Sequence, residues 1–167
     1  MRIAICDDER YWVDTLHKMV TQWALERSTL VDIEIYSMGS QLEEDLLLKH
    51  AHFDVIFLDI EFHEENNGID ISKSIRRMGN NVQIIFVSAY ALKASEGYYV
   101  DALGFLVKPY EYKNVAHFLD AASKKLAPKS VKFIEVFDKH RVFLTCPRKH
   151  GQKEVEIYSD LGRNKVS

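Results

Sequence analysis

Short runs of apolar residues recur along the first 127 positions of the chain, and each run predicts a β-strand. The run from Val31 to Tyr36 alternates apolar with polar residues, which is typical of a half-buried strand at the edge of a sheet. The run from Val55 to Leu58 is continuously apolar and predicts a central strand that is covered on both faces, and the run at 1–6 also predicts a buried strand. The five predicted strands are 1–6, 31–36, 55–58, 83–87 and 105–107.

Between these strands, apolar residues stand three or four positions apart, which predicts amphipathic helices. The weakest helical pattern lies around residues 91–99. The two clearest patterns predict core-facing residues at Trp12, Leu16, Met19, Val20 and Trp23 in one helix, and at Val115, Phe118, Leu119, Ala122 and Leu126 in another. Strands that alternate with helices form a parallel sheet, because each right-handed crossover packs its helix back onto the sheet. We therefore predict an α/β fold with a doubly wound sheet of five parallel strands in the order 2-1-3-4-5.

The chain changes in character toward its C-terminal end. Residues 1–128 contain 13 basic and 20 acidic side chains, whereas residues 129–167 contain nine and five, so the net charge of −3 divides into −7 and +4. An asymmetry of this kind favours two parts with different tasks. We predict a domain at 1–127, a linker at 128–130 and a short, β-rich basic tail at 131–167.

The overall composition is that of a soluble globular protein, with 47% apolar and 28% charged residues. This excludes a disordered chain and a disulfide scaffold. The two cysteines, Cys6 and Cys146, suit a reducing compartment. No apolar run reaches the roughly 18–20 residues that cross a bilayer. We expect a cytoplasmic protein with no membrane partner.

Acidic residues follow the first and third predicted strands. Asp7, Asp8 and Glu9 come directly after the first strand, and Asp59 comes directly after the third. The carboxyl ends of parallel strands meet at one edge of the sheet, so these carboxylates should converge there. Three converging carboxylates form a hard oxygen site that suits Mg²⁺. For Asp7 or Asp8 taken alone, capping of the following helix is an equal alternative.

The fourth strand is followed by Ser88 and the fifth by Lys108. A hydroxyl and an ammonium group can each bind a phosphoryl oxygen. Taken singly, Ser88 could cap a helix and Lys108 could pair with a nearby acid. Taken together, the four strand ends predict phosphoryl transfer, with Asp59 as nucleophile and Mg²⁺ neutralising charge on the donor phosphate.

At these strand ends the chain resembles the receiver domain of bacterial two-component response regulators, over residues 1 to about 126. The resemblance implies a flavodoxin-like (CheY-like) fold and a sensor histidine kinase as the partner that supplies the phosphoryl group. It implies a phosphoacceptor signalling protein rather than an enzyme. Such a protein catalyses only its own phosphorylation and dephosphorylation. The segments that carry the resemblance are Ile5–Glu9, Phe57–Glu61, Phe86–Tyr90 and Ala102–Tyr110.

The resemblance also implies roles for individual residues around a magnesium ion. Asp59 would be the phosphoacceptor and Asp8 a direct ligand of Mg²⁺. Asp7 would act on the metal mostly through water, and the backbone carbonyl of Glu61 would complete the protein ligands.

A switch is implied as well. Ser88 and Lys108 would bind the phosphoryl group, and the movement of Ser88 would let the Phe105 ring rotate inward. This would reshape the face formed by the fourth helix, fifth strand and fifth helix, through which we expect a homodimer. Plain core packing is the alternative role for Phe105. We expect Glu61 and Tyr90, which flank the site, to tune the attack of water and hence the phosphoryl lifetime.

Three segments of the tail, Phe133–Val136, Lys139–Leu144 and Glu154–Tyr158, are similar to early strands of LytTR-type DNA-binding domains. The resemblance implies that the intact protein binds DNA and controls transcription, whereas a solvated basic extension is the alternative. The 39 residues after Pro128 are fewer than the ~100 of an ordinary domain, so we expect only part of such a module.

Two other functions stay open at this point. The chain could be a stand-alone receiver that acts as a phosphate relay, a phosphate sink or a protein-binding switch without DNA. It could also be an aspartate-dependent phosphatase. Those enzymes usually carry a second aspartate two residues after the nucleophile, where this chain has Glu61.

Overall fold

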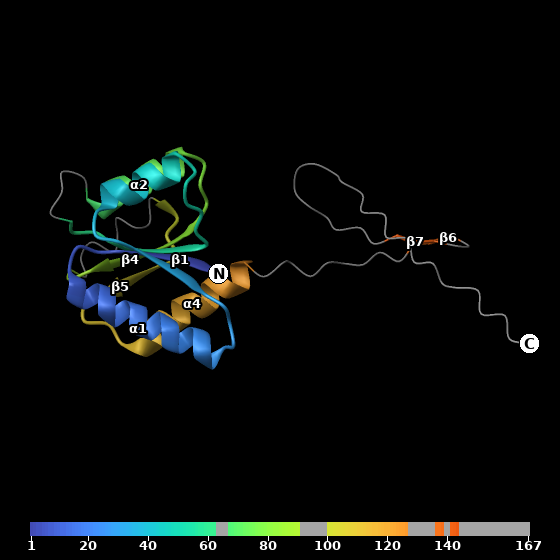
Figure 1. Ribbon diagram of the computed structural model, residues 1–167, viewed down its shortest axis with the longest axis horizontal. Coiled ribbons are helices and arrows are strands. Elements are labelled where there is room, and N and C mark those ends of the chain that lie inside the picture. Colours follow the sequence, from blue (N-terminus) through green and yellow to red (C-terminus); the bar gives the residue numbers. More distant parts are fainter. Residues whose placement is uncertain (63–66, 91–99, 127–135, 139–140, 144–167) are drawn as a thin grey trace, which may run out of the picture. The chain divides into compact units, whose positions relative to one another are not determined.

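The structure is a computed structural model that describes most of the chain (Figure 1). The chain divides into two compact units, Met1–Leu126 and Ala127–Ser167, and each is described by itself. The described residues are 1–62, 67–90, 100–126, 136–138 and 141–143.

The first unit contains a five-stranded sheet in the order β2-β1-β3-β4-β5, and every pair of neighbouring strands is parallel. This confirms the predicted fold and strand order. No helix among the described residues is both long and apolar enough to cross a membrane. The elements of this unit are β1 (Arg2–Cys6), α1 (Arg10–Glu26), β2 (Asp32–Tyr36), α2 (Gly39–Leu47), β3 (Val55–Asp59), α3 (Gly68–Arg77), β4 (Gln83–Ser88), β5 (Gly104–Val107) and α4 (Tyr112–Leu126).

Helices cover both faces of the sheet, with α1 and α4 on one side and α2 and α3 on the other (Figure 1). Alternate residues of β3 point into the two resulting cores. Val55 and Phe57 belong to the core under α1 and α4, and Ile56 and Leu58 belong to the core under α2 and α3. Because β3 is buried along its whole length, its last residue, Asp59, is carried into the interior.

The buried face of α1 differs slightly from the predicted one. Val13, Leu16 and Val20 are buried, whereas Trp12 is only half-buried at the margin of the core. Trp12 stands in the first turn of the helix, where the helix passes the carboxyl ends of the strands. The predicted assignment of Trp12 to the core face is therefore only partly right.

The far end of α1 is tied to α4 through the carboxylate of Asp120. The Trp23 indole N–H donates to Asp120 Oδ1 over 2.8 Å. The Arg27 guanidinium forms two further bonds to the same carboxylate, Nε to Oδ1 over 2.7 Å and Nη2 to Oδ2 over 2.9 Å. This cluster is open to solvent, with side-chain exposures of 37% for both Arg27 and Asp120.

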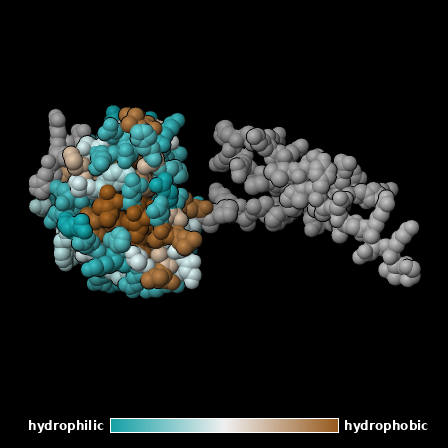
Figure 2. Space-filling view, viewed as in Figure 1, coloured by the Kyte–Doolittle hydropathy of each residue, from teal (hydrophilic) through white to brown (hydrophobic). Residues whose placement is uncertain are grey.

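Strand β2 forms one edge of the sheet, as its alternating pattern predicted. Ile35 on this strand and Leu25 and Leu30 just before it are exposed. Figure 2 shows apolar residues gathered between α1 and α2, across the middle of the face that is turned to the viewer. Acidic side chains of the same strand, Asp32 and Glu34, pair with Arg2 of β1, and charged edges of this kind discourage pairing with other strands.

Arg76, near the end of α3, holds the chain that leads into β5. Its Nε donates to the carbonyl of Val100 over 2.8 Å, and its Nη1 donates to the carbonyl of Asn80 over 2.9 Å. Its Nη2 lies 3.4 Å from the carbonyl of Asp101. The predicted helix around 91–99 lies outside the described residues.

In the second unit the structure describes one antiparallel strand pair, β6 (Val136–Asp138) and β7 (Arg141–Phe143). These strands overlap the first two tail segments that are similar to LytTR strands, Phe133–Val136 and Lys139–Leu144, with shifted bounds. The third segment, Glu154–Tyr158, lies outside the described residues.

Candidate functional site

Asp7 stands directly after β1 at the carboxyl edge of the sheet and is 4% exposed. Its backbone N–H donates to the carbonyl of Tyr36 over 3.0 Å, so the end of β2 fixes its position. Its Oδ1 accepts the backbone N–H of Glu9 over 2.9 Å. Helix α1 begins at Arg10, so the N-cap position belongs to Glu9 rather than to Asp7 or Asp8.

Asp59 ends β3, and its side chain is 2% exposed. Its Oδ1 accepts the backbone N–H of Glu61 over 3.1 Å. The chain returns against this point at Gly68, the first residue of α3, where an added Cβ would stand 1.9 Å from the carbonyl oxygen of Asp59. Only glycine permits this approach. Asn67 caps α3 by accepting the backbone N–H groups of the next two helical residues after Gly68.

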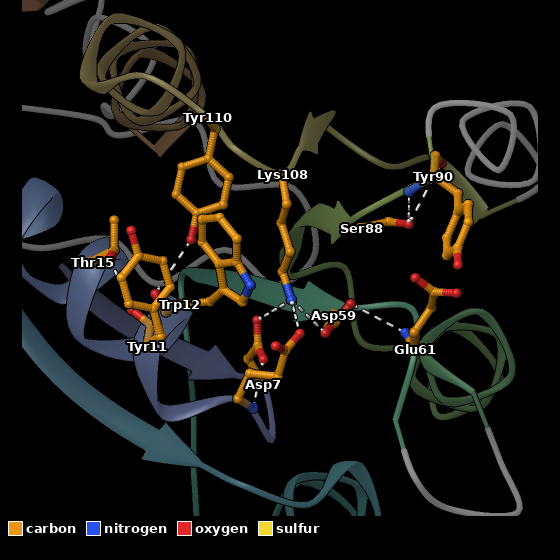
Figure 3. A network of polar contacts seen from close by, with 11 residues as sticks. Asp7, Tyr11, Trp12, Thr15, Asp59, Glu61, Ser88, Tyr90, Lys108 and Tyr110 are labelled. Atoms are coloured by element: carbon orange, nitrogen blue, oxygen red, sulfur yellow. Dashed lines mark hydrogen bonds and ion pairs between the residues drawn. The ribbon is translucent and has the colours of Figure 1, made fainter.

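Lys108 follows β5, and its backbone N–H donates to the carbonyl of Ser88 over 2.8 Å. Its side chain reaches across the edge of the sheet and is 4% exposed. The ammonium nitrogen lies 2.8 Å from Asp7 Oδ2, 2.8 Å from Asp59 Oδ2 and 3.3 Å from Glu9 Oε1 (Figure 3). The ion pair that the sequence allowed for Lys108 is therefore present, and it is the centre of the site.

Burial sets the electrostatics of this cluster. Burial raises the pKa of Asp7 to about 6, helped by the nearby charge of Asp59 and opposed by the hydrogen bond from Lys108. Burial also raises the pKa of Asp59, against the lowering effect of Lys108 and the Glu61 N–H. For Lys108, burial lowers the pKa, but the two carboxylates outweigh it and the net pKa is raised. The site therefore favours the charged form of Lys108 and disfavours the ionised forms of Asp7 and Asp59.

The donor set fits a divalent cation. One carboxylate oxygen from each of Asp7, Glu9 and Asp59 lies within 4.8 Å of the others, and together they could hold a metal ion. All three are hard oxygen ligands of the kind that Mg²⁺ prefers. The predicted convergence of Asp7 and Asp59 is confirmed. Glu9 joins them, whereas Asp8 is not in this group of described residues.

Ser88 ends β4 and is fully buried. The hydrogen bonds of its hydroxyl that the structure describes are to the backbone of Tyr90, whose N–H donates to Ser88 Oγ over 3.0 Å. Figure 3 places Glu61 and Tyr90 on the side of Asp59 away from Trp12.

Phe105 lies on β5 opposite Phe86 of β4. It is half-buried and packs against the core under α2 and α3. This contact fits the core-packing alternative, and the switch role of Phe105 stays a prediction.

An aromatic group next to Lys108 was missed by the sequence analysis. The Trp12 ring centroid lies 5.5 Å from Lys108 Nζ, and the rings of Trp12 and Tyr110 are 5.5 Å apart. The Tyr110 hydroxyl donates to the carbonyl of Trp12 over 3.3 Å. Burial, together with the charges of Asp7 and Asp59, raises the pKa of Tyr110. Their positions in the sequence could have indicated this group, because Trp12 comes soon after the acidic run 7–9 and Tyr110 comes two residues after Lys108.

Comparison with known families decides what this arrangement belongs to. The sequence pattern of the response regulator receiver domain matches residues 3–120. The chain belongs to this family. Its receiver unit therefore carries the buried acids and lysine at the carboxyl edge of a fold that the family shares.

The receiver is similar to curated sensory transduction proteins. It is 30% identical over 127 residues to LytT of Bacillus cereus, which covers 75% of this chain and 48% of the relative. It is 30% identical over 127 residues to LytR of Staphylococcus saprophyticus, with 75% and 47% covered. The match to LytT of Enterococcus faecalis is 26% over 158 residues, with 88% and 62% covered, and so extends beyond the receiver. The chain spans about half the length of the first two relatives.

Solved structures support the receiver fold. The response regulatory domain of protein mrkE from Klebsiella pneumoniae superposes with a TM-score of 0.65 at 21% identity, covering 75% of this chain and 97% of that one. The N-terminal domain of a response regulator/sensory box/GGDEF 3-domain protein from Carboxydothermus hydrogenoformans gives a TM-score of 0.64 at 19% identity, with 75% of this chain and 95% of that one covered. At these identities the likeness concerns the fold alone.

Proposed function

We propose that this chain is the phosphoacceptor part of a response regulator and that Asp59 accepts a phosphoryl group from a sensor histidine kinase. The observation that carries the proposal is the Asp59 carboxylate, which is buried at the edge of the sheet with Oδ1 held by the Glu61 N–H and Oδ2 by Lys108. A carboxylate oxygen of Asp59 attacks phosphorus, a P–O bond forms, and the P–N bond of the phosphohistidine breaks with its electron pair passing to the imidazole.

Lys108 helps to keep the nucleophile, the Asp59 carboxylate, in its ionised form. Burial raises the pKa of Asp59 and so makes its carboxylate a better base than an ordinary one, while the ammonium at 2.8 Å favours its ionised form. After transfer, Lys108 and Ser88 bind phosphoryl oxygens in place of their present partners. Ser88 then leaves Tyr90, and Phe105 rotates inward.

The acids around Lys108 would hold Mg²⁺, which supplies charge neutralisation at the phosphoryl group. Asp7, Glu9 and Asp59 are the carboxylates whose spacing supports this role. We also propose Asp8 as a ligand and the Glu61 carbonyl as the last protein donor, on the resemblance to receivers.

Glu61 and Tyr90 flank Asp59 on the side away from Trp12 (Figure 3). Tyr90 is 59% exposed. We propose that these two side chains tune the approach of water to the aspartyl phosphate, and hence its lifetime. An unchanged dephosphorylation half-life in Tyr90→Ala would contradict this role for Tyr90.

Intact-mass analysis after incubation with Mg²⁺ and a small phosphodonor tests the site. The wild type should gain one phosphoryl group, Asp59→Asn should gain none, and the exposed control Asp32→Asn should behave as the wild type. A phosphoryl adduct on Asp59→Asn, or none on the wild type, would contradict the proposal.

We further propose that the whole protein controls transcription through a LytTR-type output, with a homodimer formed through the helix expected at 91–99, β5 and α4. The match to the Enterococcus faecalis LytT protein over 158 residues supports an output region of that kind, and the +4 charge of the tail suits phosphate contacts. Titration of the phosphorylated protein with DNA at several salt concentrations tests this. Absence of binding would favour a receiver that acts as a phosphate relay, a phosphate sink or a protein-binding switch.

A further inference from the structure

Aromatic side chains form one wall beside the Lys108 ammonium (Figure 3). Trp12 lies in the first turn of α1, and the centroid of its ring lies 5.5 Å from Lys108 Nζ. Cations within about 6 Å of an indole face are attracted by its quadrupole. Tyr11 meets the Trp12 ring edge-on at 4.9 Å, and Tyr110 lies against it at 5.5 Å. The indole is therefore supported by two neighbouring rings.

The attraction to the indole differs in kind from the other contacts of Lys108. The ion pairs with Asp7, Asp59 and Glu9 depend on the charges of those acids. These charges are offset when a cation binds them, and the charge of Asp59 changes again when the residue is phosphorylated. The quadrupole of Trp12 is the same in every one of these states. Lysine has a flexible four-carbon stem, so its ammonium needs a contact that persists while its ion pairs exchange.

We propose that Trp12 is a positioning residue for Lys108. Its indole face holds the ammonium at the carboxyl edge of the sheet while the acids change partners, so that Nζ stands ready for an incoming phosphoryl oxygen. This inference rests on the proposed phosphorylation of Asp59. Tyr110 takes part indirectly, because its hydroxyl is bonded to the Trp12 carbonyl and its ring packs on the indole.

The size of the effect follows from the strength of a cation–π contact in a partly desolvated place. Loss of such a contact slows a step that depends on it by about threefold to thirtyfold. Replacement by phenylalanine keeps a weaker ring face, and replacement by leucine keeps apolar volume without a ring. We expect phosphorylation to be fastest in the wild type, slower in Trp12→Phe and slowest in Trp12→Leu.

Two constants measured on the full chain separate positioning from damage to the fold. The first is the maximal phosphorylation rate at saturating Mg²⁺ with a small phosphodonor, followed by intact mass. The second is the Mg²⁺ dissociation constant from calorimetry. Trp12→Leu should lower the rate about threefold to thirtyfold without weakening Mg²⁺ binding. Trp23→Phe, a change on the same helix far from Lys108, should alter neither constant. An unchanged rate in Trp12→Leu, or a parallel loss of rate and Mg²⁺ affinity, would overturn the proposal.

A spectroscopic measurement tests the contact without phosphorylation. The ring current of Trp12 should shift the Lys108 ε-methylene resonance upfield in the wild type, and Trp12→Leu should return it to the ordinary lysine position. An unshifted resonance in the wild type would refute the inference while leaving phosphorylation of Asp59 intact. A wild type that shows the shift but accepts no phosphoryl group would instead refute the proposed function.

Discussion

At one end of α1 the carboxylates of Asp7 and Asp59 are buried around Lys108, and at the other end the carboxylate of Asp120 meets Arg27 in contact with solvent. Both clusters join segments that are far apart in the sequence. Their electrostatics are opposite. The hydrogen bond from Arg27 lowers the pKa of Asp120, whereas burial raises the pKa values of Asp7 and Asp59.

The difference separates a structural contact from a site. Folding favours the ionised form of Asp120, so its cluster helps to hold α1 against α4. Folding disfavours the ionised forms of Asp7 and Asp59 even with the Lys108 ammonium beside them, so their charges detract from stability. The fold retains an unfavourable group of acids at the edge of the sheet, which is consistent with a role in chemistry.

Removal of the buried cation should have the largest effect. Lys108→Met leaves two buried carboxylates without their ammonium partner, and we expect the free energy of unfolding at pH 7.5 to fall by about 3 kcal/mol in metal-free buffer. Saturating Mg²⁺ should restore much of this loss, because it neutralises the same oxygens. Urea denaturation with and without Mg²⁺ measures both values.

The matched control for this variant is Lys73→Met, which removes a half-exposed lysine paired with Asp70. It should change the free energy of unfolding by less than about 0.5 kcal/mol. An equal loss of stability in Lys108→Met with and without Mg²⁺ would mean that the acids do not bind the ion.

The pH dependence of Mg²⁺ affinity comes next in size. The pKa of Asp7 is raised from 3.8 to about 6, so the folded protein holds this proton more tightly than the unfolded chain. The stability that this proton contributes is fully present below pH 3.8 and is lost as the pH rises through 6. Mg²⁺ competes with the proton, so its affinity should rise about tenfold between pH 5 and 7 and then level off. Calorimetric titrations across this range check it, and a constant affinity would contradict it.

The smallest effects compare the two clusters directly, through the same substitution in each. Asp7→Asn removes a disfavoured charge, and we expect the free energy of unfolding in metal-free buffer at pH 7.5 to rise by about 1 kcal/mol. Asp120→Asn removes a favoured charge and should lower it by about 0.5 kcal/mol. Thermal denaturation of both variants measures the signs. Shifts in the same direction would show that the two clusters do not differ as described.

The sequence predicted the sheet and most of its site because both depend on simple patterns. A continuously apolar strand such as β3 must be buried on both faces, and parallel strands bring the residues at their carboxyl ends to one edge of the sheet. Asp7, Asp59 and Lys108 meet for that reason alone.

Side-chain directions within the turns could not be predicted in this way. Glu9 rather than Asp8 joins the other acids, because the bond from the Glu9 N–H to Asp7 fixes the turn before α1. Helical spacing grouped Trp12 with Leu16, but Val13 takes the buried place beside the sheet. A helical period of 3.6 residues leaves the residues at the margin of the buried face ambiguous, and tertiary contacts decide between them.

Arg76 has a consequence for how this receiver can vary. Its Nε and Nη2 bind the carbonyls of Val100 and Asp101, so the end of α3 fixes where the chain enters β5. The position of Lys108, which follows β5, therefore depends on α3. Exchanging residues 91–99 for those of another receiver should therefore leave Lys108 in register with Asp59.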